Sequence, residues 1–389
     1  MAVRLANEQD KRAYYTMLSY CFNMGNHNIE NQVANSSFPA DEIILNEIDG
    51  NVCQCTHVIP YNISFDGKIA KMGGIGGVSS LPEYRDFGGI KDILTYSLSY
   101  MKERGMVFSA LGPFSFEFYR KYGWEWVFNF QKLKFSVNDL KNSPKAHKYL
   151  SLNKEHDELV NDFRNDFIKN INGPVYFDEK IRKERWEKCY NQFIHCYAAL
   201  DENNKVEAIA YFKIENRVLI CDEFFFKNET GRQHMLHLFY THRSQVDHIE
   251  LQLLKDDNIR VVLPTPRIQN WEWPNMMFRI VDVKQAIELM KANNIKGSFK
   301  IKVIDKQAEW NNKIFKVSID KNEINVTPIE NTKTYDFETT IQRLSQLVIG
   351  FVDGNEAIKL EIVKVNNDKK IDLFNQFFTR RPNMIWHPF

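Results

Sequence analysis

The sequence predicts a mixed α/β (α+β) protein of two or three domains, and three observations carry this prediction. The chain contains 389 residues, whereas a single domain usually has about 100–200. Its first part alternates predicted strands and helices, and from about residue 193 the order of strands, helix and strand returns, as expected for a diverged structural repeat. From Met276 the pattern changes again. We therefore predict domains covering residues 1–143, 144–275 and 276–389.

Periodicity and turn residues predict the elements of the first domain. The spacing of apolar residues favours helices at Lys11–Phe22, 90–101 and Phe114–Tyr122. Polar residues 23–39 lack such periodicity, so they are predicted to form a loop bordering a substrate pocket. Asp49-Gly50 and Asp66-Gly67 indicate hairpins. Strands are predicted at residues 42–48, 52–65, 69–78, 106–111 and 124–135.

The remaining chain gives a coarser pattern. Residues 136–185 are charged and are predicted to be helical or irregular. Strands resume near Phe193, followed by a helix near 231–243 and a strand at 249–254. The last part predicts a strand and helix in 278–291, three antiparallel strands within 297–329, a helix at 339–347 and an extended segment at 359–363.

Composition narrows the class of protein. Lys and Arg number 51 and Asp and Glu 50, a formal net charge of +1, so no nucleic-acid or anionic-membrane partner is expected. The chain lacks a secretory signal at its charged start and any apolar run of about 20 residues, so no membrane span is expected. The six cysteines lack paired CxxC spacing. They are expected to be buried reduced thiols in a cytoplasmic protein without a metal site.

A glycine cluster closes the third strand of the first domain. Gly73, Gly74, Gly76 and Gly77 lie within five residues of an otherwise apolar strand. Glycine weakens a strand, so the cluster indicates either a β-bulge or a ligand that approaches the backbone closely. A strained sheet edge without a ligand is the alternative.

The segment after these glycines carries a possible anion site. It leads from strand to helix through Arg85-x-x-Gly88, and the first amides of a helix attract anions. A turn of this kind suits the diphosphate of coenzyme A, and Arg85 adds a full positive charge. The same glycines are also compatible with a simple tight turn. The candidate cofactor residues of this segment are Val78, Ser79, Ser80, Arg85, Asp86, Phe87, Gly88, Gly89 and Ile90.

Tyr119 is a candidate catalytic residue on the next short helix. It lies in the sequence Ser115-Phe-Glu-Phe-Tyr119-Arg-Lys-Tyr-Gly-Trp124. A phenol with a pKa near 10 can donate a hydrogen bond to a departing thiolate, whose conjugate acid has a pKa near 8.5. Tyr119 could equally be a packed aromatic residue, as most of the 16 tyrosines must be.

The motifs GGVSSLPEYRDFGG and ALGPFSFEFYRKYGW resemble the GNAT acetyltransferase superfamily, and more closely its Eis-type (enhanced intracellular survival) members. NMMFRIVDVKQAIELM and the closing WHPF resemble later parts of the same family. The resemblance implies two tandem GNAT-like folds followed by a sterol carrier protein-like α/β domain. It also implies acetyl-CoA as co-substrate and a homo-oligomer, a hexamer in family members.

The resemblance assigns roles to particular residues. It implies Tyr119 as general acid, and as base the carboxylate of Phe389, reaching back into the first domain's active site. It also implies contacts to acetyl-CoA from Val78, Ser80, Arg85, Gly88 and Ser115. Ile90 stands where the superfamily pattern often has a small residue, so one phosphate contact is either lost or supplied by Gly89. The second GNAT-like region has no Arg-x-x-Gly turn, and we expect it not to bind coenzyme A.

The resemblance thus predicts an acetyl-CoA-dependent N-acetyltransferase that moves an acetyl group directly to a primary amine. A multi-amine acceptor such as an aminoglycoside or polyamine is implied, and Glu30, Asp41 and Glu42 are candidates for its recognition. The alternative is a non-catalytic module that binds coenzyme A or an apolar ligand.

Overall fold

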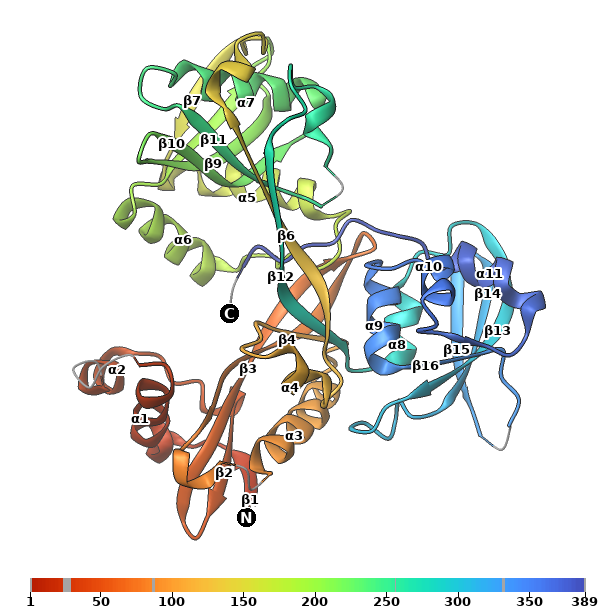
Figure 1. The fold of residues 1–389 in the computed structure, drawn as a ribbon. Coiled ribbons are helices and arrows are strands. Elements are labelled where there is room, and N and C mark those ends of the chain that lie inside the picture. Colours follow the sequence, from red (N-terminus) through yellow and green to blue (C-terminus); the bar gives the residue numbers. More distant parts are fainter. Residues whose placement is uncertain (1, 24–28, 86–87, 256, 331–332, 388–389) are drawn as a thin grey trace. The chain divides into compact units, whose positions relative to one another are not determined.

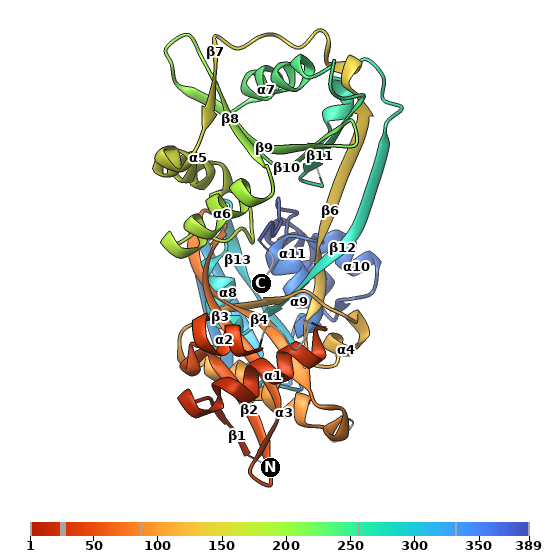
Figure 2. The ribbon, with the colours of Figure 1, turned by 90° about the vertical axis from the view of Figure 1, so that its left-hand side faces the viewer.

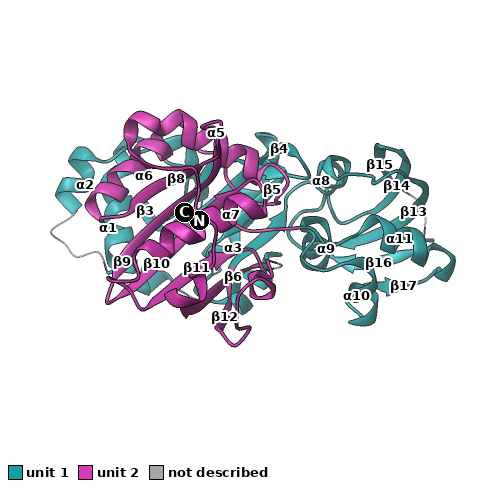
Figure 3. Ribbon diagram, turned by 90° about the horizontal axis from the view of Figure 1, so that it is seen from above, with its two compact units in different colours: residues 1–127, 276–381, 387–389 teal, residues 128–275, 382–386 magenta. Residues whose placement is uncertain are grey.

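The computed structural model describes residues 2–23, 29–85, 88–255, 257–330 and 333–387, and the chain divides into two compact units (Figures 1 and 3). The first unit contains residues 1–127, 276–381 and 387–389, and the second contains 128–275 and 382–386. Two long strands, β6 (Glu125–Ser136) and β12 (Gln269–Ile280), each run from one unit into the other.

The first part of the first unit is a sheet with helices on both faces. Its strands lie in the order β1 (Ala2–Leu5), β2 (Ile43–Ile48), β3 (Asn51–Phe65), β4 (Lys68–Ser80), β5 (Phe108–Leu111) and β12. Neighbouring strands are antiparallel except β4 and β5, which are parallel. The helices are α1 (Lys11–Cys21) and α2 (Ile29–Asn35) on one face, α3 (Gly89–Glu103) on the other (Figure 1), and α4 (Phe116–Arg120) after β5.

Alternation along β2 and β3 explains why both faces are covered. Ile43 and Leu45 pack with residues of α1 such as Met17, whereas Ile44 packs with residues of α3 such as Leu94. Successive side chains of a strand point to opposite faces, so a strand that is apolar at every position requires a helix on each side. The helix α2 corrects the prediction of a loop throughout 23–39. It is a short helix without buried residues, so it gives no apolar periodicity to detect.

The last part of the first unit is a second sheet. Its strands lie in the order β15 (Glu323–Ile329), β14 (Ile314–Lys321), β13 (Ile295–Ile304), β16 (Phe337–Thr340) and β17 (Lys364–Val365). Its helices are α8 (Val283–Leu289), α9 (Ile341–Ile349), α10 (Gly354–Lys359) and α11 (Ile371–Phe377). The three predicted antiparallel strands are confirmed.

The predicted helix at 339–347 is present as α9 with a later start, and one prediction in this region is wrong. Residues 339–340 end β16, and Thr340 caps α9 by accepting a hydrogen bond from the Arg343 N–H. The predicted extended segment at 359–363 is instead the end of α10 and a turn. The Asp353 side chain caps α10, so a cap rather than apolar periodicity marks the start of this short helix.

The second unit repeats the architecture of the first sheet. Its strands lie in the order β7 (Lys148–Leu152), β8 (His195–Leu200), β9 (Val206–Glu215), β10 (Val218–Phe226), β11 (His248–Leu253) and β6. Its helices are α5 (Asp157–Ile168) and α6 (Glu179–Asn191) on one face and α7 (Glu229–Thr241) on the other (Figure 2). The strand β7 was not predicted within the charged segment 136–185.

The two repeats exchange their last strands. The strand β6, which follows α4 in the chain, pairs with β11 of the second unit. In turn β12, which follows the second repeat, pairs with β5 of the first unit, with Met277 opposite Leu111. Each sheet is therefore completed by a strand from the other repeat.

Candidate functional site

The strands β4 and β5 part at the glycine-rich segment. Residues Met72–Ile75 pair in parallel with Phe108–Leu111, where β5 ends, while β4 continues to Ser80. Within the described part of the chain, no strand pairs with residues 76–80 on that side of β4. The backbone there is an open strand edge whose N–H and C=O groups can bind an extended ligand.

A β-bulge lies in this open segment, as one of the two predicted alternatives for the glycine cluster. Cys55 is opposite Ser79 but His57 is opposite Gly76, so Gly77 and Val78 together face Thr56 of β3. Gly77 has a φ of +59°, which disfavours other residues. The bulge turns the backbone of Val78 and Ser79 relative to the regular ladder.

The turn after β4 presents Arg85 beside the start of α3. Arg85 is exposed, and its Nε donates to the Ser80 carbonyl at 3.3 Å. Asp86 and Phe87 lie outside the described residues. Gly88 has a φ of +83° and precedes α3 without a side-chain cap hydrogen bond. Gly89 and Ile90 form its first turn.

A buried pair of side-chain amides is hydrogen-bonded to this turn. Gln54 and Asn46 are 1% and 0% exposed, and the Asn46 amide donates to Gln54 Oε1 at 2.7 Å. Gln54 Nε2 donates to the Tyr84 carbonyl at 2.9 Å and to Ser80 Oγ at 3.3 Å. A Cβ at Gly89 would lie 1.8 Å from Gln54 Oε1, so glycine is required for this approach.

The side chains of the predicted serines face different surroundings. Ser79 is 2% exposed and points, like its partner Cys55, to the face covered by α1. Ser79 can therefore serve a ligand only through its backbone. Ser115 caps α4 by accepting a hydrogen bond from the Phe118 N–H at 3.3 Å.

Tyr119 lies on α4 in the same apolar cluster as residues of the open edge. It is 3% exposed and packs in one cluster with Ile75, Val78 and Ile90. Among the described residues its hydroxyl has no hydrogen-bond partner, and burial raises the pKa of this phenol. The ring of Phe114, 75% exposed, lies 5.5 Å from that of Tyr119.

The chain end returns to the first unit. The ring of His387 packs edge-on against Tyr61 of β3, with centroids 5.9 Å apart. Tyr61 and His57 lie four residues apart on one strand, so both point to the face covered by α1 and α2. Phe389 lies outside the described residues.

Ionisable groups on that face are already partly paired. His57, opposite the first residue of the open edge, bonds Glu42 through Nε2 and Oε2 at 3.0 Å. Glu30 is paired with Arg12, and Asp41 accepts a bond from the Tyr100 hydroxyl through its backbone carbonyl. The described residues contain no cluster of three or more His, Cys, Asp or Glu side chains that could hold a metal ion.

The sequence motifs therefore lie together, but four residues of the site region were not predicted. They are Gln54, Asn46, His57 and Phe114. The detectable signal for Asn46 was a polar residue two positions from Ile44, which packs with residues of α3. A single polar residue at an apolar strand position is compatible with many roles, so it does not by itself indicate a ligand site.

The second unit keeps the parted strands but starts its following helix differently. Val218–Cys221 of β10 pair in parallel with His248–Leu251, and a bulge follows between Cys221 and Glu223. However, the Asn228 side chain caps α7 and Glu229 occupies its first turn. The cap occupies one of the free amides and the carboxylate repels phosphate, so this helix start differs from that of α3.

Comparisons with known proteins agree with this architecture. Two families, each described as an acetyltransferase (GNAT) domain, match residues 2–127 and 175–280, and the sterol carrier protein domain family matches residues 283–386. The chain is thus built from two GNAT acetyltransferase domains followed by a sterol carrier protein domain. It is an acyltransferase of the GNAT class, and the GNAT fold implies acetyl-CoA as co-substrate.

Solved structures share the fold over the whole chain. A GCN5-related N-acetyltransferase of Anabaena variabilis is 16% identical with a TM-score of 0.88, and alignment covers 100% of both chains. A probable N-acyltransferase of Enterococcus faecalis is 20% identical with a TM-score of 0.84, covering 100% of this chain and 99% of that chain. Eis1 of Mycobacterium abscessus is 14% identical with a TM-score of 0.81, covering 100% of both.

The predicted Eis-type domain composition and fold are confirmed by these matches. None of the curated proteins compared with the chain matches it. Among the described residues, no helix has the length and apolar character needed to cross a membrane.

Proposed function

We propose that the first unit binds acetyl-CoA along the open edge of β4 and transfers its acetyl group directly to a primary amine. The pantetheine arm would pair with the backbone of Val78, Ser79 and Ser80. The diphosphate would lie at the start of α3, against Arg85 and the backbone of residues 86–90. The observation that carries the proposal is an open, bulged strand edge leading directly to an uncapped helix start beside an exposed arginine.

The chemistry requires an electrophile, an acid and a base. Backbone amides of the bulge would polarise the thioester carbonyl, and holding both substrates together would supply much of the acceleration. Tyr119 would donate a hydrogen bond to the departing thiolate of coenzyme A. Burial raises the pKa of Tyr119, so the phenol would act as a hydrogen-bond donor that keeps its proton. Ser115 would position Tyr119 by capping α4.

The amine must lose a proton before or during attack. An amine with a pKa near 10.4 is about 10³-fold more protonated than free at neutral pH. We assign the acceptor role to the carboxylate of Phe389, acting through water. The packing of His387 against Tyr61 supports it, since two further residues span at most about 7 Å. A multi-amine acceptor would meet the Glu42–His57 pair on this face.

An Arg85→Glu variant tests the cofactor site. We expect the KM for acetyl-CoA to rise about 10–100-fold, because a charge-assisted contact contributes about 1.5–3 kcal/mol. Thiol release from acetyl-CoA would be measured with polyamines, aminoglycosides and lysine peptides as acceptors. The matched control is Arg104→Glu, the same charge change at the exposed opposite end of α3. Equal KM values for both variants would contradict the proposal.

A one-residue deletion tests the carboxylate role separately. Removing Phe389, or extending the chain beyond it, is expected to lower kcat strongly with the melting temperature unchanged. Full activity of the extended chain would exclude Phe389 as the base. Tight coenzyme A binding without turnover of any amine would instead favour a non-catalytic binding module.

The remaining finer predictions belong to this proposal. They are the domain bounds 1–143, 144–275 and 276–389, a cytoplasmic location, a hexamer and a role for the sterol carrier protein domain in carrying the chain end to the site.

A further inference from the structure

A cavity lies at one edge of the second sheet, in the sterol carrier protein domain. The strand β16 pairs only with Ile301–Ile304 of β13, so among the described residues no strand covers residues 295–299 on that side. Ser298 and Phe299 border the cavity there, and β14 and the segments before β16 and after β17 supply its other walls. Its volume is about 730 Å³, within the range of about 300–1,000 Å³ that is typical of small-molecule sites.

Positive charge is in excess on the wall of this cavity. Its one acidic lining residue is Asp336, whereas four of the lining residues are lysines, namely Lys300, Lys316, Lys333 and Lys370. Lys300 and Lys316 are direct partners across β13 and β14, so their side chains emerge on the same face of the sheet. Like charges directly opposite each other destabilise an antiparallel pair. The stability of the sheet therefore gives no reason for this arrangement.

The carboxylate of Asp336 is already bonded to neutral donors. One of its oxygens accepts a hydrogen bond from the Lys300 backbone N–H at 2.7 Å, and the other accepts one from Asn367 Nδ2 at 2.6 Å. These bonds hold Asp336 in place between β13 and the segment after β17. Its charge is not paired with an ammonium group of the wall.

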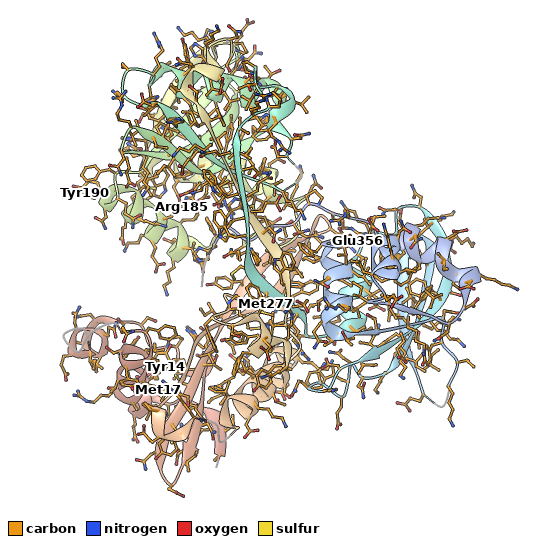
Figure 4. All side chains as sticks on the ribbon, in the orientation of Figure 1. Tyr14, Met17, Arg185, Tyr190, Met277 and Glu356 are labelled. Atoms are coloured by element: carbon orange, nitrogen blue, oxygen red, sulfur yellow. The ribbon has the colours of Figure 1, made fainter. Side chains whose placement is uncertain are left out.

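Other cations of this domain have ion-pair partners. Lys296, four residues from Lys300 on β13, lies 3.2 Å from Asp320, and Arg380 pairs with Glu356 of α10 (Figure 4). By contrast, within the part of the chain that the structure describes, no carboxylate forms an ion pair with any of the four cavity lysines. An anionic ligand would supply the missing counter-charge.

We propose that this cavity binds a soluble anion that carries two or more phosphate groups, with the ammonium groups of the four lysines as its counter-charges. The ammonium group of lysine binds phosphate as a point charge, whereas planar carboxylates are more often recognised by the fork of arginine. All four cations of the wall are lysines. Ser298, two residues from Lys300 on the same face of the sheet, adds a hydroxyl. The site belongs to the sterol carrier protein domain and does not depend on the cofactor site proposed at β4 and α3.

A double variant tests the site by removing the opposed pair. Lys300→Gln/Lys316→Gln is expected to keep or slightly raise the melting temperature of the free protein, because a like-charge contact is lost. The affinity for one inorganic pyrophosphate per chain, measured by calorimetric titration at constant ionic strength, is expected to fall at least tenfold. The matched control is Lys296→Gln/Lys313→Gln, which removes the same charge from two lysines of this domain that have carboxylate partners.

The two double variants separate a built site from general charge. The wild type and the control are expected to bind pyrophosphate alike, and at least tenfold more tightly than orthophosphate. Equal pyrophosphate affinities of the wild type and Lys300→Gln/Lys316→Gln would overturn the proposal, as would an equal loss in both double variants or no binding to the wild type.

Two further titrations identify the source of the phosphate groups. Pyrophosphate bound at the proposed cofactor site is a separate event, which Arg85→Glu is expected to weaken and both double variants to keep. ATP that binds the lysine cavity more tightly than pyrophosphate would indicate a nucleotide as the ligand, and equal affinities would indicate recognition of the phosphate groups alone.

A measurement on the wild type keeps the proposal testable if the double variant does not fold. Acetic anhydride modifies accessible lysines, and mass spectrometry reports the rate at each one. Pyrophosphate is expected to slow the modification of Lys300 and Lys316 at least severalfold, while the exposed Lys296 serves as internal control and keeps its rate. Unchanged rates at Lys300 and Lys316 would overturn the site.

Discussion

Tyr119 combines a buried ring with a hydroxyl that has no partner among the described residues, so its hydroxyl is more useful to a ligand than to the fold. Tyr119→Phe is therefore expected to lower kcat about 10²-fold or more while the melting temperature changes little. The control is Tyr122→Phe, which changes a half-buried tyrosine packed on Phe118 and should retain activity. Steady-state kinetics of both variants decides the matter, and wild-type kcat in Tyr119→Phe would contradict the role.

The pH dependence of this residue has a definite sign. Burial raises the pKa of Tyr119 above its ordinary value of about 10, so the neutral phenol persists throughout the neutral and mildly alkaline range. Between about pH 8 and 10, we therefore expect no fall in the kcat of the wild type that is absent from Tyr119→Phe. The kcat–pH profiles of both proteins test this expectation. A fall in kcat between about pH 8 and 10 in the wild type alone would show that the phenol ionises in that range.

Individual site residues were predictable where a local pattern carries the chemistry. Arg85 and Gly88 follow from a turn whose pattern suits a phosphate, and Gly77 follows from a glycine cluster inside a strand. Gln54 and Asn46 were not predictable, because their role depends on a neighbouring strand and on the approach of Gly89, neither of which is local in sequence.

The bulge of β4 is the element that distinguishes the open edge from a regular strand. Gly77 has a φ of +59°, and a Cβ there would lie 3.2 Å from Leu18 Cδ2. Gly77→Ala is expected to cost about 1–2 kcal/mol of unfolding free energy and to raise the KM for acetyl-CoA severalfold.

A second glycine with positive φ provides a control that separates the loss of stability from the loss of acetyl-CoA binding. Gly50 has a φ of +78° in the hairpin between β2 and β3, with open space around the position that a Cβ would take. Gly50→Ala should lose similar stability and keep its KM. Chemical denaturation and acetyl-CoA kinetics of both variants test this, and equal KM values would show that the bulge is not part of the cofactor site.

Elements with strong periodicity or turn signals were predicted well, whereas short ones were not. The helices α1 and α3 and the hairpins of β2, β3 and β4 follow from apolar spacing and Asp-Gly pairs. The strand β7 and the helices α2 and α10 are at most seven residues long. Such elements are specified by caps and tertiary contacts more than by their own pattern.

At the scale of the whole molecule, the exchange of β6 and β12 is the feature that sequence patterns could not supply. The strand β6 was predicted over nearly its whole length, whereas only the end of β12, from Phe278, was predicted as a strand. The pairing of β6 with β11 and of β12 with β5 is a non-local choice. The repeat was detectable because the same order of predicted strands and helices occurs twice along the chain. The pairing partners of β6 and β12 could not be detected in this way.

A buried ion pair joins the first GNAT domain to the sterol carrier protein domain within the first unit. Arg279 of β12 and Asp305 are each 0% exposed at their side chains, and Arg279 Nη2 donates to both carboxylate oxygens at 2.8 and 2.7 Å. Arg279 Nη1 also donates to the Tyr122 carbonyl, at the end of the segment that carries Tyr119. Removing one partner of such a pair leaves an uncompensated buried charge, which costs about 3–5 kcal/mol.

Asp305→Ala is therefore expected to destabilise the first unit by about 3–5 kcal/mol in chemical denaturation and to lower kcat, since the Tyr122 segment loses its anchor. The control is Asp320→Ala, which removes an exposed pair with Lys296 and should cost at most about 1 kcal/mol. Adding Arg279→Met to Asp305→Ala should recover part of the stability, because the orphaned cation is then gone. If Asp305→Ala unfolds like the control, the Arg279–Asp305 pair is not what holds the two domains together.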